Sequence, residues 1–201
     1  ARAHLGDPTT GQGGHAGDFR VSDNTPCPPP STPGQVQVCK VAGLGVTAGT
    51  NFTFTLTANG ESKSVVVAAG AGPNGTCVNA GGFCVGTTVD LHETAQTGVN
   101  TTAIVVSPAG AQQGTSDLAG GNASIIVGTG MTSVTYTNQG PTGTLVICKV
   151  GGTGVTAGTN FTFTAGGRSA TVAAGAAANG TCGTALTLGA GAVTVTEVAS
   201  A

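Results

Sequence analysis

The sequence predicts an all-β protein made of two tandem immunoglobulin-like β-sandwich modules. The first observation is an internal repeat, because residues 36–55 return almost unchanged at 145–164. The second is the alternation of Val, Thr and Phe over short runs, which is typical of half-buried strands. The third is the close spacing of these runs, with Gly, Asn and Pro turn signals between them. A repeat of this length indicates that one β-rich unit occurs twice in the chain.

The composition excludes several classes of function. Only 7% of the residues are charged, and the net charge is −2. A net charge of this sign and size does not provide the basic surface that binds a nucleic acid. No apolar run approaches the ~20 residues that a membrane-spanning helix needs, so we expect no membrane span. The sequence also offers no cofactor motif, and we expect no cofactor.

Six cysteines occur, and four of them follow the repeat. Their recurrence predicts one disulfide inside each module, and the two cysteines without a counterpart form the remaining pair. A zinc site is the competing interpretation, but the sequence contains no Cys-x-x-Cys motif and no histidine near these cysteines. Disulfides predict an oxidising environment, so we expect a secreted, extracellular or cell-surface protein. The predicted pairs are Cys39–Cys77, Cys148–Cys182 and Cys27–Cys84.

Residues 1–34 form a Gly- and Pro-rich arm and linker whose Pro run favours a stiff, extended spacer. Residues 35–139 form the first module, in which Asn59-Gly60 is a strong hairpin signal. Residues 140–143 are a short hinge. The second module, 144–201, repeats the first four strands and then ends. The strands predicted in the first module are 35–41, 51–58, 62–68, 87–94, 99–107, 122–128 and 132–138.

Strand parity points three polar side chains toward the core of the first module. Residues i and i+2 of a strand share a face, so Lys40 lies on the face of Val36 and Val38. By the same rule Glu93 follows Val89 and Leu91, and Asn138 follows Val134 and Tyr136. The second module keeps part of this pattern, with Lys149 and Glu197 at the matching positions.

Two interpretations of Lys40, Glu93 and Asn138 remain open. An unpaired buried charge is costly, so the three groups could form a hydrogen-bonded ion pair. Alternatively, burial favours a neutral lysine amine and a protonated carboxyl. The amine would then attack the Asn138 carboxamide and release ammonia, with Glu93 as the catalytic acid. Glu197 would be the equivalent acid beside Lys149. The product would be an isopeptide bond, made once by the protein on itself.

The motifs around these residues resemble the B-type repeats of Gram-positive collagen adhesins and pilin shafts. The resemblance rests on Lys40, on Glu93 in Val-Asp-Leu-His-Glu, and on Asn138 in Val-Thr-Tyr-Thr-Asn. It implies prealbumin-like sandwiches that carry Lys–Asn isopeptide bonds. The cysteine beside Lys40 departs from that pattern, and a disulfide at this place could replace the cross-link.

The second module lacks a counterpart for the strands that close the first one, so either the sequence is a fragment of a longer array or another subunit completes the module. An open sheet edge invites pairing with another strand. The arm contains a strand-like phrase, Phe19-Arg-Val-Ser-Asp23, with the parity of the closing strand 132–138. We therefore predict that Phe19, Val21 and Asp23 of one copy complete the second module of its neighbour, with Asp23 or Asn24 near Lys149. Head-to-tail pairing of this kind produces a filament.

Together these features predict a structural protein and no enzyme beyond the self-cross-link. We expect a secreted subunit of an extracellular fibre or pilus, or of an adhesin stalk, that forms homopolymers. The alternative is a monomeric surface adhesin module that binds a host protein or a glycan. Six Asn-x-Ser/Thr sequons are possible glycosylation sites. They are Asn51, Asn74, Asn100, Asn122, Asn160 and Asn179.

Overall fold

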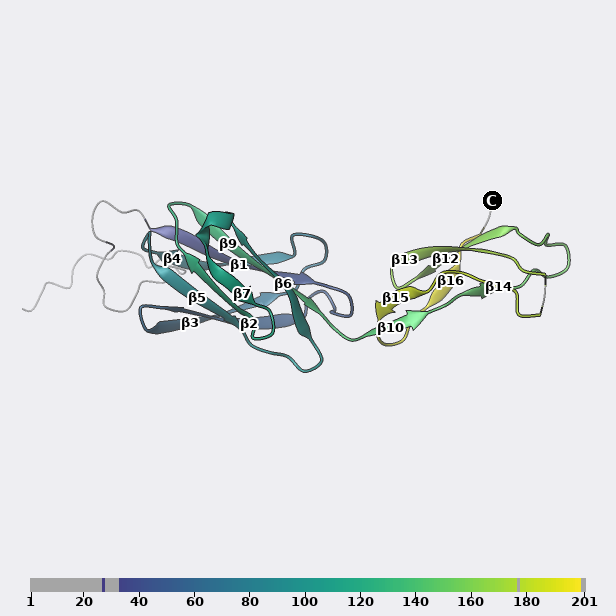
Figure 1. The fold of residues 1–201 in the computed structure, drawn as a ribbon, viewed down its shortest axis with the longest axis horizontal. Coiled ribbons are helices and arrows are strands. Elements are labelled where there is room, and N and C mark those ends of the chain that lie inside the picture. The colour runs from purple at the N-terminus through teal and green to yellow at the C-terminus, as the bar shows by residue number, and fades with distance from the viewer. Residues whose placement is uncertain (1–26, 28–32, 177, 200–201) are drawn as a thin grey trace, which may run out of the picture.

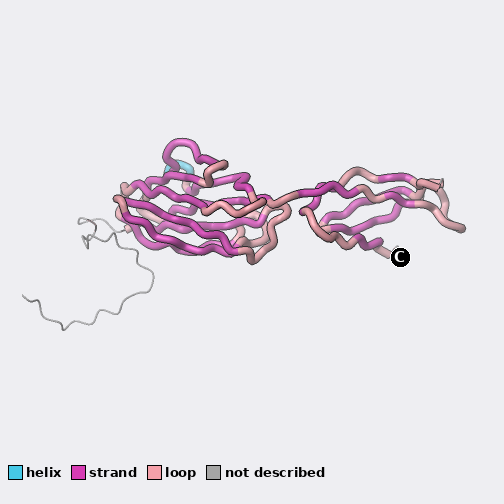
Figure 2. The backbone as a smooth tube through the Cα atoms, turned by 90° about the horizontal axis from the view of Figure 1, so that it is seen from below, coloured by secondary structure: helices cyan, strands magenta, loops and turns pink. Residues whose placement is uncertain are grey.

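The structure is a computed structural model that describes residue 27, residues 33–176 and residues 178–199. Within these residues the chain is all-β, apart from one 3-10 turn at Ala109–Ala111. The strands form two β-rich bodies that lie end to end along the longest axis of the molecule (Figure 1). A second view, turned by 90°, shows the same end-to-end arrangement (Figure 2). We keep the names first and second module for residues 35–139 and 144–201.

The first module is a sandwich of two sheets. One sheet has the order β4-β1-β9-β6 and the other has the order β3-β2-β5-β8-β7. The first strand, β1, pairs antiparallel with β4 on one side and parallel with the closing strand β9 on the other. The strands are β1 (Gly34–Ala42), β2 (Asn51–Ala58), β3 (Glu61–Ala68), β4 (Thr76–Phe83), β5 (Thr88–Glu93), β6 (Asn100–Ser107), β7 (Gln112–Asp117), β8 (Asn122–Ile126) and β9 (Met131–Gln139).

The core of the first module lies between its two sheets. The alternating residues of β1, β2, β5 and β9 contribute apolar side chains that are almost fully buried. The rings of Phe54 from β2 and Tyr136 from β9 lie 4.8 Å apart and join the sheets at the centre. Burial of these large side chains supplies most of the driving force for folding. Lys40, Glu93 and Asn138 share this interior, as strand parity predicts.

Two strands of the first module were not predicted from the sequence. β4 contains Asn79, Gly81 and Gly82, which are poor strand formers. It pairs with β1 through a bulge at Val36/Gln37, and Gly81 has a φ of +112° that few other residues adopt. β7 is rich in Gln, Ser, Thr and Gly, and it pairs irregularly with β8. Tertiary pairing therefore overrides weak local propensity at both strands.

The second module repeats part of each sheet of this sandwich. β12, β13 and β16 form a three-stranded sheet in which Phe163 pairs with Glu197, as Phe54 pairs with Glu93 in the first module. The counterparts of β1 and β4 are each broken into two short strands, which pair as β10-β15 and β11-β14. The strands are β10 (Thr142–Leu145), β11 (Cys148–Lys149), β12 (Asn160–Ala165), β13 (Arg168–Ala173), β14 (Thr181–Cys182), β15 (Leu186–Gly189) and β16 (Val195–Glu197).

The described part of the second module, 144–176 and 178–199, contains no counterpart of β6, β7, β8 or β9. Its inner face is consequently open. Val193 and Val195 are 37% and 43% exposed, whereas the matching Val89 and Leu91 of the first module are 0% and 1% exposed. The described part of the second module therefore keeps the counterparts of β1 to β5 but lacks the strands that cover them in the first module.

The two modules meet at a close joint. The Gly140 amide donates a hydrogen bond to the Leu44 carbonyl, and the Ala190 amide donates one to the Pro141 carbonyl. β10 begins at Thr142, inside the predicted hinge of residues 140–143. These contacts hold the β1–β2 loop of the first module against the start of the second module.

Candidate cross-linking site

Three elements bring Lys40, Glu93 and Asn138 together. Lys40 lies near the end of β1, and Asn138 lies near the end of the parallel neighbour β9. In the register of this pair Lys40 stands opposite Tyr136, so Asn138 is two residues further along on the same face. Glu93 is the last residue of β5, in the opposite sheet. The sandwich thus places an amine and a carboxamide on one sheet and a carboxyl across from them.

Glu93 links the other two side chains through one oxygen. Its Oε1 accepts a hydrogen bond from Lys40 Nζ at 2.5 Å and another from Asn138 Nδ2 at 2.8 Å. Its Oε2 accepts a hydrogen bond from the Thr101 hydroxyl of β6 at 2.9 Å. The carboxyl is therefore held in place by three donors, and it keeps the lysine and the asparagine side by side. Thr101 lies in a predicted strand, but nothing in its sequence context marks this role.

The site is dry and aromatic. Lys40 is 0% exposed, and its Nζ lies 4.0 Å from the centroid of the Phe52 ring. Burial lowers the pKa of Lys40 from 10.5 to about 8, although the hydrogen bond and charge of Glu93 act in the opposite direction. A larger fraction of Lys40 is therefore a neutral amine near physiological pH than of an exposed lysine.

Two buried polar atoms beside this amine have no hydrogen-bond partner. They are the carboxamide oxygen of Asn138 and the hydroxyl of Tyr136. Burial raises the pKa of Tyr136 well above its usual value, so this phenol stays protonated. Buried polar groups without a partner are rare in folded proteins. An oxygen in this state can accept a proton or a hydrogen bond when the carboxamide reacts.

A small cleft gives access to the site from outside. It has a volume of about 250 Å³, and Glu93, Thr101 and Asn138 are among the residues that line it. The other walls come from the β5–β6 loop, the start of β6 and the β7–β8 loop, at residues 94–96, 98–100 and 118–121. This volume exceeds the roughly 10–15 Å³ that a cavity needs to hold one water, so a small leaving molecule fits in the cleft.

The second module contains part of the same site. Lys149 Nζ donates hydrogen bonds to both carboxylate oxygens of Glu197, at 2.8 and 3.1 Å. It also lies 4.0 Å from the centroid of the Phe161 ring, as Lys40 does from Phe52. The side chains of Lys149 and Glu197 are 22% and 42% exposed. Strand parity therefore predicted the face on which they lie, but it did not predict that this face is open to solvent. No asparagine from the described residues reaches this pair.

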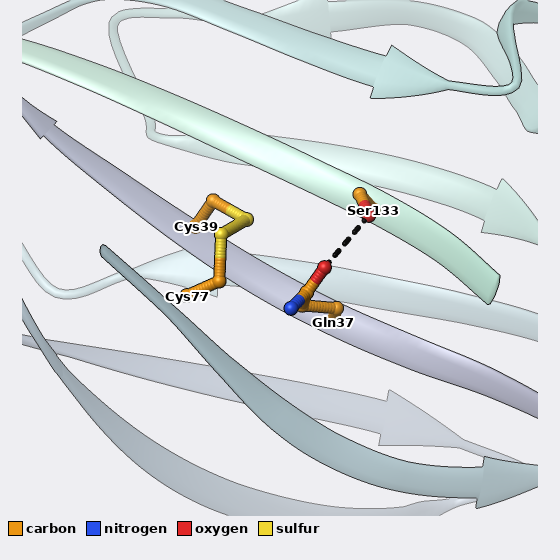
Figure 3. The surroundings of a disulfide bond; sticks show 4 residues. All are labelled: Gln37, Cys39, Cys77 and Ser133. Carbon is orange, nitrogen blue, oxygen red and sulfur yellow. Dashed lines mark hydrogen bonds between the residues drawn. A yellow bond between two sulfur atoms is a disulfide. The ribbon is translucent and has the colours of Figure 1, made fainter. Parts of the chain in front are cut away.

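The three disulfides join the predicted cysteine pairs. Cys39–Cys77 links directly opposed residues of β1 and β4 (Figure 3). Because Cys39 and Lys40 are adjacent in a strand, the disulfide lies on the face of β1 away from the Lys40 side chain. The Ser133 hydroxyl donates a hydrogen bond to Gln37 beside it, which ties β9 to β1 on that face. The disulfide and the lysine site therefore occupy opposite faces of β1 and do not compete for the same space.

The other predicted sites have simpler outcomes. All six sequon asparagines are exposed, and their glycosylation stays a prediction. The strand donors Phe19, Val21 and Asp23 lie outside the described residues, as does Asn24. In the described part of the chain no cluster of three His, Cys, Asp or Glu side chains could hold a metal ion. None of the described segments is a helix long and apolar enough to cross a membrane.

Comparison with known proteins gives a structural likeness but no family. No protein-family model matches the sequence, and no curated protein matches it. Among solved structures, the chain is similar to a bacterial adhesin from Mobiluncus mulieris that contains intramolecular disulfide, isopeptide and ester bond cross-links. The identity is 16% and the TM-score is 0.41. The match covers 55% of this chain and 42% of the adhesin chain, so it spans less than half of that protein.

Proposed function

We propose that the first module cross-links itself through an isopeptide bond between Lys40 and Asn138. We further propose that the protein is a structural part of an extracellular surface fibre, pilus or adhesin stalk. The observation that carries the proposal is the contact of both side chains with one buried Glu93 oxygen. An ordinary buried ion pair needs no carboxamide beside it, whereas the cross-link needs this third group in this place.

The reaction is a transfer of the asparagine acyl group to the lysine. The neutral Lys40 amine attacks Cγ of Asn138, while the protonated form of Glu93 donates a proton to the carboxamide oxygen. Glu93 then passes one proton from the lysine nitrogen to the leaving nitrogen and takes back its own proton from the oxygen as the carbonyl re-forms. The C–N bond of the carboxamide breaks, ammonia leaves, and Lys40 Nζ becomes an amide nitrogen. Because both side chains are bound to one Glu93 oxygen in the same folded module, the reaction avoids the entropic cost of bringing two separate molecules together.

The bond would give the module mechanical strength. β1 opens the first module and β9 closes it, and the two strands lie side by side. A Lys40–Asn138 bond closes a covalent loop of nearly the whole module, and Cys39–Cys77 ties β1 to β4. Such cross-links reduce the conformational entropy of the unfolded chain and thereby stabilise the folded state. They suit a protein that is pulled or attacked by proteases outside the cell.

The intact mass of the reduced and denatured protein tests the cross-link. We expect a deficit equal to one ammonia molecule, and a Lys40–Asn138 branched peptide after digestion. Asn138→Ala and Glu93→Gln should each restore the full mass. Lys149→Ala is the matched control, because it removes the equivalent lysine of the second module and should retain the deficit. Full mass in the unaltered chain would leave Lys40 and Glu93 as an ion pair and overturn the proposal.

Assembly of the chain into a polymer is a separate part of the proposal. The open inner face and edges of the second module support it, because unpaired strand edges recruit further strands. We propose that the arm of a neighbouring copy supplies a strand, with Phe19 and Val21 facing inward. Deletion of residues 1–24 should then abolish concentration-dependent polymers in analytical ultracentrifugation. A monodisperse monomer from the complete chain would favour the alternative, a ligand-binding stalk module.

A further inference from the structure

The Thr101 hydroxyl contacts the acid of the cross-linking site, although it takes no part in making the bond. It donates a hydrogen bond to Glu93 Oε2 at 2.9 Å, whereas Lys40 and Asn138 both donate to Oε1. Thr101 belongs to β6 and lines the same small cleft as Glu93 and Asn138. The two oxygens of the carboxyl therefore have separate partners, with both reacting side chains on one of them.

We propose that Thr101 is the positioning residue of the cross-link. Its hydroxyl occupies Oε2 of Glu93 and thereby keeps Lys40 and Asn138 together on Oε1. This inference rests on the proposed function of the first module and deepens it, because it names the group that selects which oxygen of the acid carries the proton. Thr101 does not touch the reacting atoms and acts through Glu93.

The second module shows a similar ion pair without such a hydroxyl. Lys149 lies 4.0 Å from the centroid of the Phe161 ring and pairs with Glu197, as Lys40 does with Glu93. None of the described residues donates a hydroxyl to Glu197, and Lys149 Nζ contacts both of its carboxylate oxygens, at 2.8 and 3.1 Å. Lys40 contacts Oε1 alone. The comparison indicates that a free second oxygen draws the lysine into a contact with both.

A β-bulge in β6 aims the Thr101 side chain into the site. In the register of β6 with β9, Thr101 stands opposite Asn138, and the next paired residue is Ala103. Thr102 is therefore the extra residue of the bulge. Opposed residues of an antiparallel pair share a face, so Thr101 lies on the inner face with Asn138. Thr102 is exposed, and its hydroxyl donates to a backbone carbonyl of β9 at 3.2 Å. Bulges often re-aim a side chain beside a functional site.

The Thr101 contact determines where the lysine proton goes. The proton that Lys40 shares with Glu93 moves along their hydrogen bond to Oε1, which leaves a neutral amine and a neutral carboxyl. Oε2 already receives the Thr101 proton, so a second proton there is disfavoured. Oε1 also contacts the Asn138 carboxamide, whose oxygen is buried without a partner. Rotation of the carboxamide about its Cβ–Cγ bond brings this oxygen to the protonated Oε1, where the reaction needs it.

Substitutions at Thr101 and its neighbour in the complete chain test the proposal. The chain is made by cell-free synthesis under oxidising conditions, and the intact mass of aliquots denatured over time gives the rate at which the ammonia deficit appears. Thr101→Val keeps the branched shape but lacks the hydroxyl. It should slow the reaction about 10- to 100-fold, the effect of losing a hydrogen bond to a charged group. Thr101→Ser keeps the hydroxyl and should restore most of the rate. Thr102→Val is the matched control and should react as fast as the unaltered chain.

Crystal structures of two variants that cannot form the bond give a second readout. They are Asn138→Ala and the double variant that adds Thr101→Val. In the first, Lys40 should contact Oε1 of Glu93 alone. In the second, Lys40 should contact both oxygens, as Lys149 does in the second module. A role of Thr101 in packing alone would not change this contact.

Failure of this inference is distinguishable from failure of the cross-link. A deficit that appears equally fast in Thr101→Val and in the unaltered chain overturns the role of Thr101 and leaves the cross-link standing. Equally slow reactions of Thr101→Val and Thr101→Ser would assign the effect to the lost methyl packing and also overturn it. A complete absence of the deficit from the unaltered chain overturns the cross-link. The Lys40 contacts in the two crystal structures then still decide whether Thr101 positions Glu93.

Discussion

At the scale of single residues, the decisive feature is a lysine that the fold buries beside an aromatic ring. Desolvation destabilises the charged form of Lys40. The Glu93 carboxylate and the face of the Phe52 ring stabilise that charged form. The balance leaves the pKa of Lys40 at about 8. This value serves both interpretations of the site, because a charged amine makes an ion pair and a neutral one attacks. The second interpretation requires an electrophile near the amine, and the carboxamide of Asn138, which contacts the same Glu93 oxygen, is one.

The lowered pKa of Lys40 predicts a pH dependence of stability that can be measured without the cross-link. The folded-state pKa, about 8, lies below the ordinary 10.5 of an exposed lysine. Between these values the unfolded state binds more protons, so the free energy of unfolding rises with pH, by at most about 1.4 kcal/mol per pH unit. Below pH 8 both states are protonated, and this gain is absent.

The measurement compares two variants by urea denaturation between pH 7.5 and 10. One is Asn138→Ala, which cannot form the bond, and the other adds Lys40→Met. As pH rises, the free energy of unfolding of the lysine-containing variant should increase relative to that of the Lys40→Met variant. Tyr136 and the other lysines are common to both variants, so their titration cancels. A pH-independent difference would mean that Lys40 titrates as an exposed lysine.

At the scale of the elements, the sequence predicts those strands well whose inner faces are apolar. The predicted 51–58 coincides with β2, and 62–68 misses only the first residue of β3. Alternation of large and polar side chains fixes both position and facing in such strands. The same alternation carries Lys40, Glu93 and Asn138 to one place, because their strands also bear Val, Leu and Tyr.

Elements without this alternation could not be predicted. β4 passes through two glycines, and it is held in the sheet by its pairing with β1 and by the Cys39–Cys77 disulfide to that strand. Thr101 reaches Glu93 because β6 pairs with β9, and that pairing joins distant segments of the chain. The local sequence pattern also predicts on which face of their strands Lys149 and Glu197 lie. It does not predict how exposed they are, because exposure depends on whether other strands cover that face. Non-local contacts therefore limit the prediction more than local propensity does.

At the scale of the whole molecule, two similar modules are joined with almost no free linker. The joint consists of backbone hydrogen bonds from residues 140 and 190 and a close approach of two glycines. A Cβ added to Gly189 would lie 2.8 Å from Cα of Gly45, which is too close for any side chain. Gly45 itself has a φ of +79°, a conformation that glycine adopts most readily. Small residues thus permit the contact between the modules.

This contact predicts that one methyl group can loosen the joint while both modules stay folded. Gly189→Ala must displace the Gly45 loop, because backbone atoms cannot move aside as a flexible side chain can. Gly143→Ala is the matched control, since a Cβ there meets nothing within 4 Å. We expect Gly189→Ala to broaden the interdomain distance distribution in small-angle scattering and to make the NMR tumbling times of the modules differ. The thermal unfolding midpoint of the first module should remain unchanged. Equal scattering profiles for both variants would show that the hinge residues 140–143, rather than the glycine contact, set the arrangement of the modules.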